Sequence, residues 1–139
     1  MAEIALKTTV PEVNDRGYGF GAKHTDNLVI TAHTTAAYEY VTAPADCVLK
    51  AVTFSASVTS SVSVTYALGI TNESNSSAAM IATTLYDADP VLTAGTAAEV
   101  TLSSTAANLA VAKGDIIKIG GVGGTASGLW GVVLEWELF

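Results

Sequence analysis

Apolar and polar residues alternate with a period of two in two adjacent stretches of the chain, residues 48–58 and 62–70. Alternation of this length, rich in β-branched residues, predicts two strands with one buried and one polar face. The first strand is expected to bury its even positions, Lys50 included. Ser60 and Ser61 separate the two stretches, so we expect a hairpin or a sharp corner there.

The C-terminal stretch repeats this pattern. One face is expected to carry Trp130, Val132, Leu134, Trp136 and Leu138. A strand so close to the terminus frays unless it is paired on both sides, so we expect it in the centre of a sheet. Trp130, Trp136 and Phe139 are candidates for the core or for a subunit interface, because aromatic side chains bury large apolar areas.

Weaker strand patterns occupy residues 98–102, 109–111 and 115–119. Residues 77–86 fit a strand or irregular structure better than a helix, and no long helix is expected elsewhere. The glycine run at residues 120–124 predicts a flexible loop before the last strand. It lacks the Lys-Ser/Thr pair and following helix of a phosphate-binding loop.

The first 37 residues differ from the rest. They contain Pro11, an aromatic-glycine stretch at residues 17–21, and one compact apolar cluster at residues 28–30. We interpret residues 1–37 as an extended N-terminal arm and residues 38–139 as one β-sandwich domain. The arm either wraps its own domain or reaches a neighbouring molecule, and the sequence leaves both open.

Composition narrows the class of protein. Half of the 139 residues are hydrophobic and 14% are charged, which excludes intrinsic disorder and favours a packing role over catalysis. The net charge of −7, without a basic cluster, argues against nucleic acid or an anionic membrane as partner. Neither a signal peptide nor a membrane span is evident, so cytoplasmic synthesis is expected. The single cysteine, Cys47, is expected to be buried.

Candidate metal chemistry is sparse, and we expect no metal or cofactor. His24 and His33 have no carboxylate or cysteine at ligand spacing. Asp87 and Asp89 resemble part of a calcium loop, but the further oxygen ligands are distant, which favours a local turn.

Two other residue pairs suggest sugar chemistry. Glu135 and Glu137 share one face of the last strand at a separation that suits glycoside hydrolysis, but the solvent side of an amphipathic strand is the favoured interpretation. Tyr38 and Tyr40 also share a face, and with the tryptophans they offer a sugar-stacking platform. Core or interface packing is favoured for these aromatic residues, and the chain is not expected to be an enzyme.

The strand pattern, the glycine-rich corner and the absence of helices predict an all-β protein with a jelly-roll or Greek-key β-sandwich and an extended N-terminal arm. Residues 109–119 and 129–138 resemble the closing strands of trimeric jelly rolls, and the Lys113-Gly114-Asp115 turn resembles that of tumour-necrosis-factor-like heads. The Thr/Ala-rich stretch 92–102, leading into residues 111–115, is similar to tailed-bacteriophage head decoration (capsid cement) proteins. The resemblance covers about residues 45–139.

This resemblance implies a homotrimer on the outside of a capsid that clamps major capsid proteins, located in the virion after synthesis in the host cytoplasm. It assigns the arm to capsid binding. The candidate contacts are Pro11, Arg16, Tyr18, Phe20, Leu28, Val29 and Ile30. Trimeric valency would raise affinity for a symmetric lattice.

Three alternatives remain open. One is a fibre-tip or receptor-binding jelly roll that recognises glycans, and another is a small carbohydrate-binding module. The third is a hydrolase that uses Glu135 or Glu137.

Overall fold

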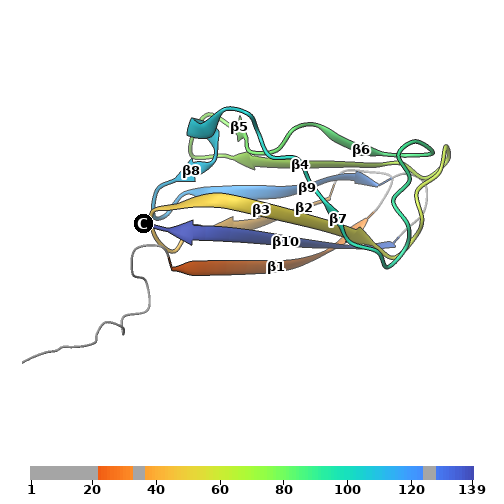
Figure 1. Cartoon of the computed structure of the whole chain (residues 1–139), viewed down its shortest axis with the longest axis horizontal. Coiled ribbons are helices and arrows are strands. Elements are labelled where there is room, and N and C mark those ends of the chain that lie inside the picture. Colours follow the sequence, from red (N-terminus) through yellow and green to blue (C-terminus); the bar gives the residue numbers. More distant parts are fainter. Residues whose placement is uncertain (1–21, 33–36, 124–127) are drawn as a thin grey trace, which may run out of the picture.

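The computed structural model describes residues 22–32, 37–123 and 128–139, and these form two antiparallel β-sheets packed face to face (Figure 1). Sheet A contains β1 (Lys23–Ala32), β10 (Gly128–Leu138), β3 (Cys47–Ala56), β7 (Ala98–Glu99) and β8 (Ala110–Val111). Sheet B contains β2 (Ala37–Thr42), β9 (Ile116–Gly123), β4 (Tyr66–Asn72), β5 (Ala78–Ala79) and β6 (Thr84–Tyr86). A 3-10 turn, Ala106–Asn108, is the one helical segment in these ranges.

The strand order identifies the sandwich as a jelly roll. Sheet A runs β1-β10-β3-β7 and sheet B runs β2-β9-β4-β5, so the first four strands alternate between the sheets and so do the last two. Two Greek keys wound together produce this order. The predicted all-β jelly-roll class is therefore confirmed. None of the described residues forms a helix long and apolar enough to span a membrane.

The last strand lies where its pattern predicts. β10 pairs with β1 on one side and with β3 on the other, in the centre of sheet A. Its alternating apolar residues from Trp130 to Leu138 are buried between the sheets. This confirms that the strand is held on both sides.

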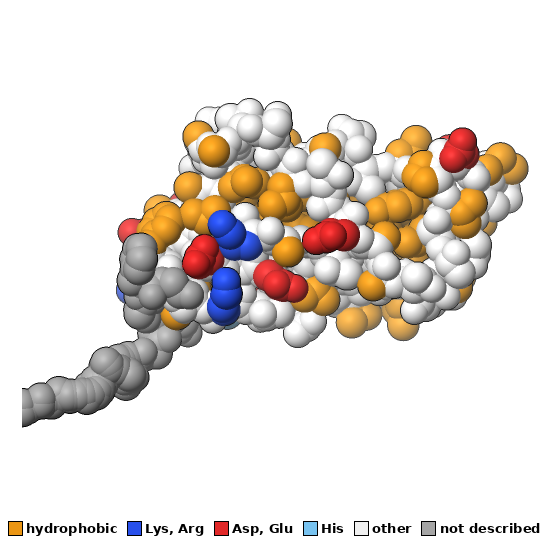
Figure 2. Space-filling view, in the orientation of Figure 1, with side chains coloured by type: hydrophobic (Ala, Val, Ile, Leu, Met, Phe, Trp, Pro, Cys, Tyr) orange, Lys and Arg blue, Asp and Glu red, His pale blue; other side chains and the backbone are white. Residues whose placement is uncertain are grey.

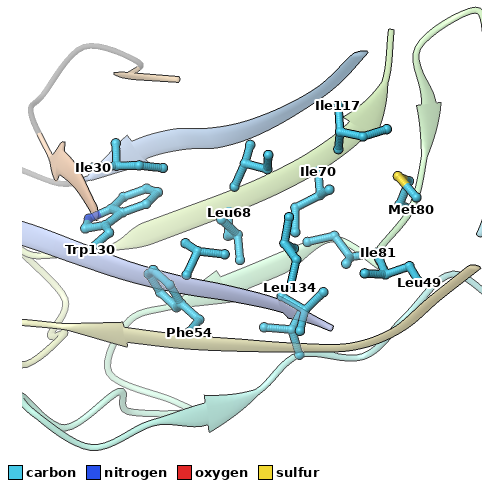
Figure 3. Close-up of a cluster of buried hydrophobic side chains, with 14 of the residues drawn as sticks. Ile30, Leu49, Phe54, Leu68, Ile70, Met80, Ile81, Ile117, Trp130 and Leu134 are labelled. Atoms are coloured by element: carbon cyan, nitrogen blue, oxygen red, sulfur yellow. The ribbon is translucent and has the colours of Figure 1, made fainter. Parts of the chain in front are cut away.

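The core fills the space between the two sheets. At one end, the Phe54 ring packs edge-on against Trp130 with 5.2 Å between centroids, and Tyr66 packs edge-on against the same indole at 5.7 Å. At the other end, Leu49, Met80 and Ile81 meet in an aliphatic cluster (Figure 3). Burial of these side chains supplies the main driving force for folding.

The predicted face of β3 is only partly correct. Val52, Phe54 and Ala56 are buried as expected, but Lys50 is exposed and Leu49 is buried instead. The register explains the change, because Glu135 lies opposite Ala51 while Trp136 lies opposite Leu49. Lys50 is thus the extra residue of a β-bulge. The bulge shifts the alternation by one residue, so that Leu49 faces the core and the charge of Lys50 stays in solvent.

The connection from β3 to β4 is a corner and not a hairpin, because the two strands belong to different sheets. Tyr66, Leu68 and Ile70 are buried as the alternation predicts. Val62 is exposed because residues 61–64 form a tight turn closed by backbone hydrogen bonds between Ser61 and Val64. The weaker strand predictions are confirmed, in shortened form as β7 and β8 and in lengthened form as β9. Residues 77–86 contain the short β5 and β6.

Two expectations about chain organisation are wrong. Residues 23–32, assigned to the arm, form β1 and pair with β10 along its length, so they belong to the sandwich and its boundary does not lie at Tyr38. Gly120 and Gly121, assigned to a flexible loop, lie within β9 between β2 and β4. A Cβ atom at Gly121 would lie 1.8 Å from the Ala67 carbonyl oxygen, so the close approach of the backbones requires glycine there.

Candidate functional site

The described candidate metal and acid-base residues do not gather at one place in the fold. Among the described residues, no three His, Cys, Asp or Glu side chains lie close enough together to hold a metal ion. His24 Nε2 lies 3.2 Å from Asp26 Oδ1 on the same strand, and His33 lies outside the described residues. The backbone N–H of Asp89 donates a 2.9 Å hydrogen bond to Asp87 Oδ1, which confirms the local turn.

Glu135 and Glu137 lie on the outer, solvent-facing side of sheet A. Glu137 Oε1 lies 3.5 Å from Lys50 Nζ, and Lys23 is the cross-strand neighbour of Glu137. Glu135 is exposed opposite Thr25. These contacts confirm the solvent-side interpretation of the amphipathic strand.

The predicted interface aromatics separate into two kinds. Trp130 and Trp136 are buried inside the monomer, so they belong to the core and are not available to another subunit. Phe139 is 58% exposed, and its backbone N–H donates a hydrogen bond to the Asp46 carbonyl oxygen. Of the three, Phe139 alone remains a candidate contact.

Three of the candidate capsid contacts lie on β1, and its alternation divides them. Ile30 is buried in the core, so it is not a capsid contact. Leu28 is partly buried and packs against the core. Val29 points outward and is 67% exposed. Pro11, Arg16, Tyr18 and Phe20 lie outside the described residues.

Most charged residues on the outer side of sheet A lie at one end, and Glu99 of β7 is exposed in the middle of the face, in the cross-strand row of Thr53 and Val133. Lys23, Lys50, Glu135 and Glu137 occupy the half nearest Leu138, where opposite charges lie side by side. Figure 2 shows charged side chains gathered over one part of this face, and mostly apolar and uncharged polar side chains over the rest.

The end of this face away from Leu138 carries a small apolar patch. Val29 pairs with Gly131, Thr31 pairs with Leu129, and Asn27 pairs with Val133, which brings Val29, Leu129 and Val133 together across two strands. Leu129 is exposed and Val133 is half-buried. We call these three residues the β1–β10 patch. Apolar side chains collected at a sheet edge are suited to contact another protein surface.

Sheet B has a groove on its outer side with a volume of about 460 Å³. Its floor is made where β4 and β9 pair, at Ala67, Gly69 and Gly120, and carries almost no side chain. Tyr38 and Lys118 form one wall, with Lys118 Nζ 4.3 Å from the centre of the Tyr38 ring. The segment from Ala79 to Thr84 forms the opposite wall.

Polar groups gather at one end of this groove. Glu73 accepts hydrogen bonds from the hydroxyl groups of Thr71 and Ser77, and all three residues line the groove. The bond from Thr71, with smaller contributions from Ser77 and Lys118, lowers the pKa of Glu73 below its usual value. The Glu73 carboxylate is therefore charged at neutral pH.

No family model, no curated protein and no solved structure matches this chain.

The sequence indicated only part of these surfaces. Tyr38 and Tyr40 are both exposed on β2, so packing in the core is wrong for them, and Tyr38 does line the groove. The tryptophans do not join it. Sequence reasoning missed the groove floor, although Gly69, a glycine on the outward side of an alternating strand, was its signal.

Proposed function

We propose that this protein is a non-catalytic structural component of a virus particle. In this proposal it binds the outer surface of a bacteriophage capsid as a homotrimer and stabilises contacts between major capsid proteins. The jelly-roll topology is compatible with this role, because such sandwiches recur as building blocks of viral capsids.

The observation that carries the proposal is the β1–β10 patch. Val29 and Leu129 are 67% and 52% exposed, at the end of the face away from the paired charges of Lys50 and Glu137. A surface of this kind loses little on desolvation and gains from burial against a second apolar surface. We assign the patch to contact with a second copy of the chain.

The low overall charge agrees with an assembly role. Only 14% of the residues are charged, and the exposed positions on β1 beyond Lys23 are Thr25, Asn27, Val29 and Thr31. Short, uncharged side chains lose little conformational entropy when another subunit covers them. Clusters of lysine or glutamate, which oppose edge association, are absent from this half of the described strand.

The first test is the solution mass of the full chain by light scattering. A mass of three times 14.2 kDa is expected. Val29→Asp and Leu129→Asp, each placing a charge in the patch, should shift the protein towards monomer. Thr25→Asp, on the same face outside the patch, should leave the mass unchanged. A wild-type monomer at micromolar concentration would overturn the trimer.

The second test is co-sedimentation with capsids. Heads of the virus whose genome encodes the chain, prepared without this protein, should bind the wild-type trimer saturably. A variant lacking residues 1–21 tests whether those residues contribute. A stable trimer that fails to sediment with the heads would reject the capsid role while leaving the oligomer intact.

A further inference from the structure

The groove on sheet B is a second surface with different chemistry, on the opposite side of the sandwich from the β1–β10 patch. Its volume of about 460 Å³ lies in the range of small-molecule sites, roughly 300–1,000 Å³. From its lining we infer that the groove binds a neutral saccharide. This inference does not depend on the capsid role.

The shape of the groove follows from an unusual absence of side chains. Gly69 on β4 and Gly120 on β9 are cross-strand neighbours, and Ala67 is the next outward residue on β4. In most sheets these positions carry side chains that cover the backbone. Here the missing side chains leave a trough in the middle of the sheet, bounded by Tyr38 and Lys118 on β2 and β9 and by the Ala79–Thr84 segment.

The lining favours a polyhydroxylated ligand. Tyr38 is 42% exposed and offers ring area for the apolar face of a sugar. The hydroxyl groups of Thr71 and Ser77 donate to Glu73, and that of Thr84 donates to the Ala82 carbonyl oxygen, so these hydroxyl oxygens offer acceptors to a ligand in the groove. The Glu73 carboxylate adds acceptors and the Lys118 ammonium adds donors, so the groove presents both hydrogen-bond donors and acceptors.

The charge balance selects a neutral ligand. Among the residues that line the groove, Glu73 is the one carboxylate and Lys118 the one cation, so the site has no net charge. A phosphate or nucleotide would meet the repulsion of Glu73 together with the attraction of Lys118. A neutral sugar can use both groups.

The backbone argues against a peptide as the occupant. Peptides that extend a sheet need a strand with unpaired N–H and C=O groups. The floor strand β4 is paired with β9 on one side and with β5 and β6 on the other, and β9 is paired with β2 and β4. The groove therefore offers polar side chains around a floor of paired strands, a surface that suits a sugar ring.

The test is an amide NMR titration of the full chain with four neutral disaccharides: cellobiose, maltose, lactose and diacetylchitobiose. At least one should cause saturable shifts confined to the groove, at Tyr38, Gly69, Thr71 and Gly120. Sodium phosphate serves as the anionic probe and should leave these amides unshifted. Tyr38→Ala should weaken the binding of the active sugar by about tenfold, which corresponds to about 1.4 kcal/mol.

Gly69→Val is the sharpest variant, because it fills the floor without straining the fold. A Cβ atom at Gly69 would lie 3.7 Å from the Gly120 carbonyl oxygen, an ordinary contact, and valine suits a strand. This variant should keep the wild-type spectrum outside the groove and lose binding. Thr25→Val, which places a valine on the outer face of sheet A away from the groove, should bind like wild type.

Three outcomes would overturn the inference. The first is that none of the four disaccharides shifts the groove amides. The second is that a correctly folded Gly69→Val variant binds as tightly as wild type, which would place any sugar site elsewhere. The third is that phosphate binds in the groove while the sugars do not, which would make Lys118 an anion site.

Discussion

The indole Nε1 of Trp136 donates a 2.9 Å hydrogen bond to Asp26 Oδ2 across the pairing of β10 and β1. This bond joins a buried ring of the central strand to a carboxylate of the edge strand. The other tryptophan of β10 lacks such a partner, since the buried Nε1–H of Trp130 has no hydrogen-bond acceptor among the described residues. The two indole N–H groups on β10 therefore differ: that of Trp136 is hydrogen-bonded, and that of Trp130 is not hydrogen-bonded to any described residue.

Removing the Asp26 carboxylate should destabilise the fold. Asp26→Ala leaves the Trp136 N–H without its acceptor, and we expect a loss of about 1–3 kcal/mol in the free energy of unfolding. Asp26→Asn keeps an acceptor oxygen and should lose less. Urea denaturation measures both. In a Trp136→Phe background the cost of Asp26→Ala should shrink, and an unchanged cost would show that the bond contributes nothing.

The two tryptophans should respond differently to the same substitution. Both Trp→Phe changes remove similar apolar area, but Trp136→Phe also leaves Asp26 Oδ2 without its donor. Trp130→Phe removes a buried N–H that has no acceptor in the described part of the chain. We expect Trp136→Phe to be the more destabilising by about 1 kcal/mol. Chemical denaturation of the two variants under one condition provides the comparison, and equal losses would contradict the proposed difference.

The glycines of sheet B should differ sharply in how well they tolerate substitution by alanine. Gly121→Ala places a Cβ 1.8 Å from the Ala67 carbonyl oxygen at a φ of 157°, so it should cost more than about 3 kcal/mol or prevent folding. Gly69→Ala is its control on the neighbouring strand and should change stability by less than about 0.5 kcal/mol. Thermal unfolding followed by circular dichroism distinguishes them. Similar melting temperatures would mean that the β4–β9 spacing relaxes easily.

Cys47 should make stability fall at alkaline pH. Burial, reinforced by the carboxylates of Asp26, Asp46 and Asp115, raises the pKa of this thiol from 9.0 to about 11. As pH rises above 9.0 the unfolded chain loses the thiol proton first. The contribution of Cys47 to the free energy of unfolding is therefore intact below pH 9.0 and declines as the pH approaches 11.

The matched comparison is Cys47→Ala, which lacks the titrating group. The difference in urea midpoint between wild type and this variant should narrow between about pH 8 and about pH 10.5. A constant difference would show that the thiol titrates alike in both states. Cys47 should also react with thiol reagents only after unfolding, because its side chain is fully buried.

Sequence patterns were most informative where a strand alternates without interruption. From Trp130 to Leu138 every inward residue is apolar, so the buried face and the central position of β10 followed directly. The inward positions of β1 include His24 and Asp26, which hide the alternation. Their burial depends on partners such as the Trp136 N–H, more than one hundred residues away in sequence, which no local pattern contains.

The glycine run at residues 120–124 led to a wrong prediction for a related reason. A run of glycines usually indicates a loop, but Gly120 and Gly121 lie in the middle of sheet B because two neighbouring strands approach them closely. That approach is a property of the assembled sheet. The bulge at Lys50 and the groove over Gly69 likewise depend on strand pairing, so the sequence predicted the strands but not the surfaces they create.

The central place of β10 has a consequence for biosynthesis. A ribosome makes β1 and β3 long before β10, yet neither can join the other in sheet A until β10 lies between them. Until β10 is synthesised, the apolar side chains that sheet A buries stay exposed to chaperones and to neighbouring nascent chains. Until β10 is in place, the outer face of sheet A is therefore incomplete.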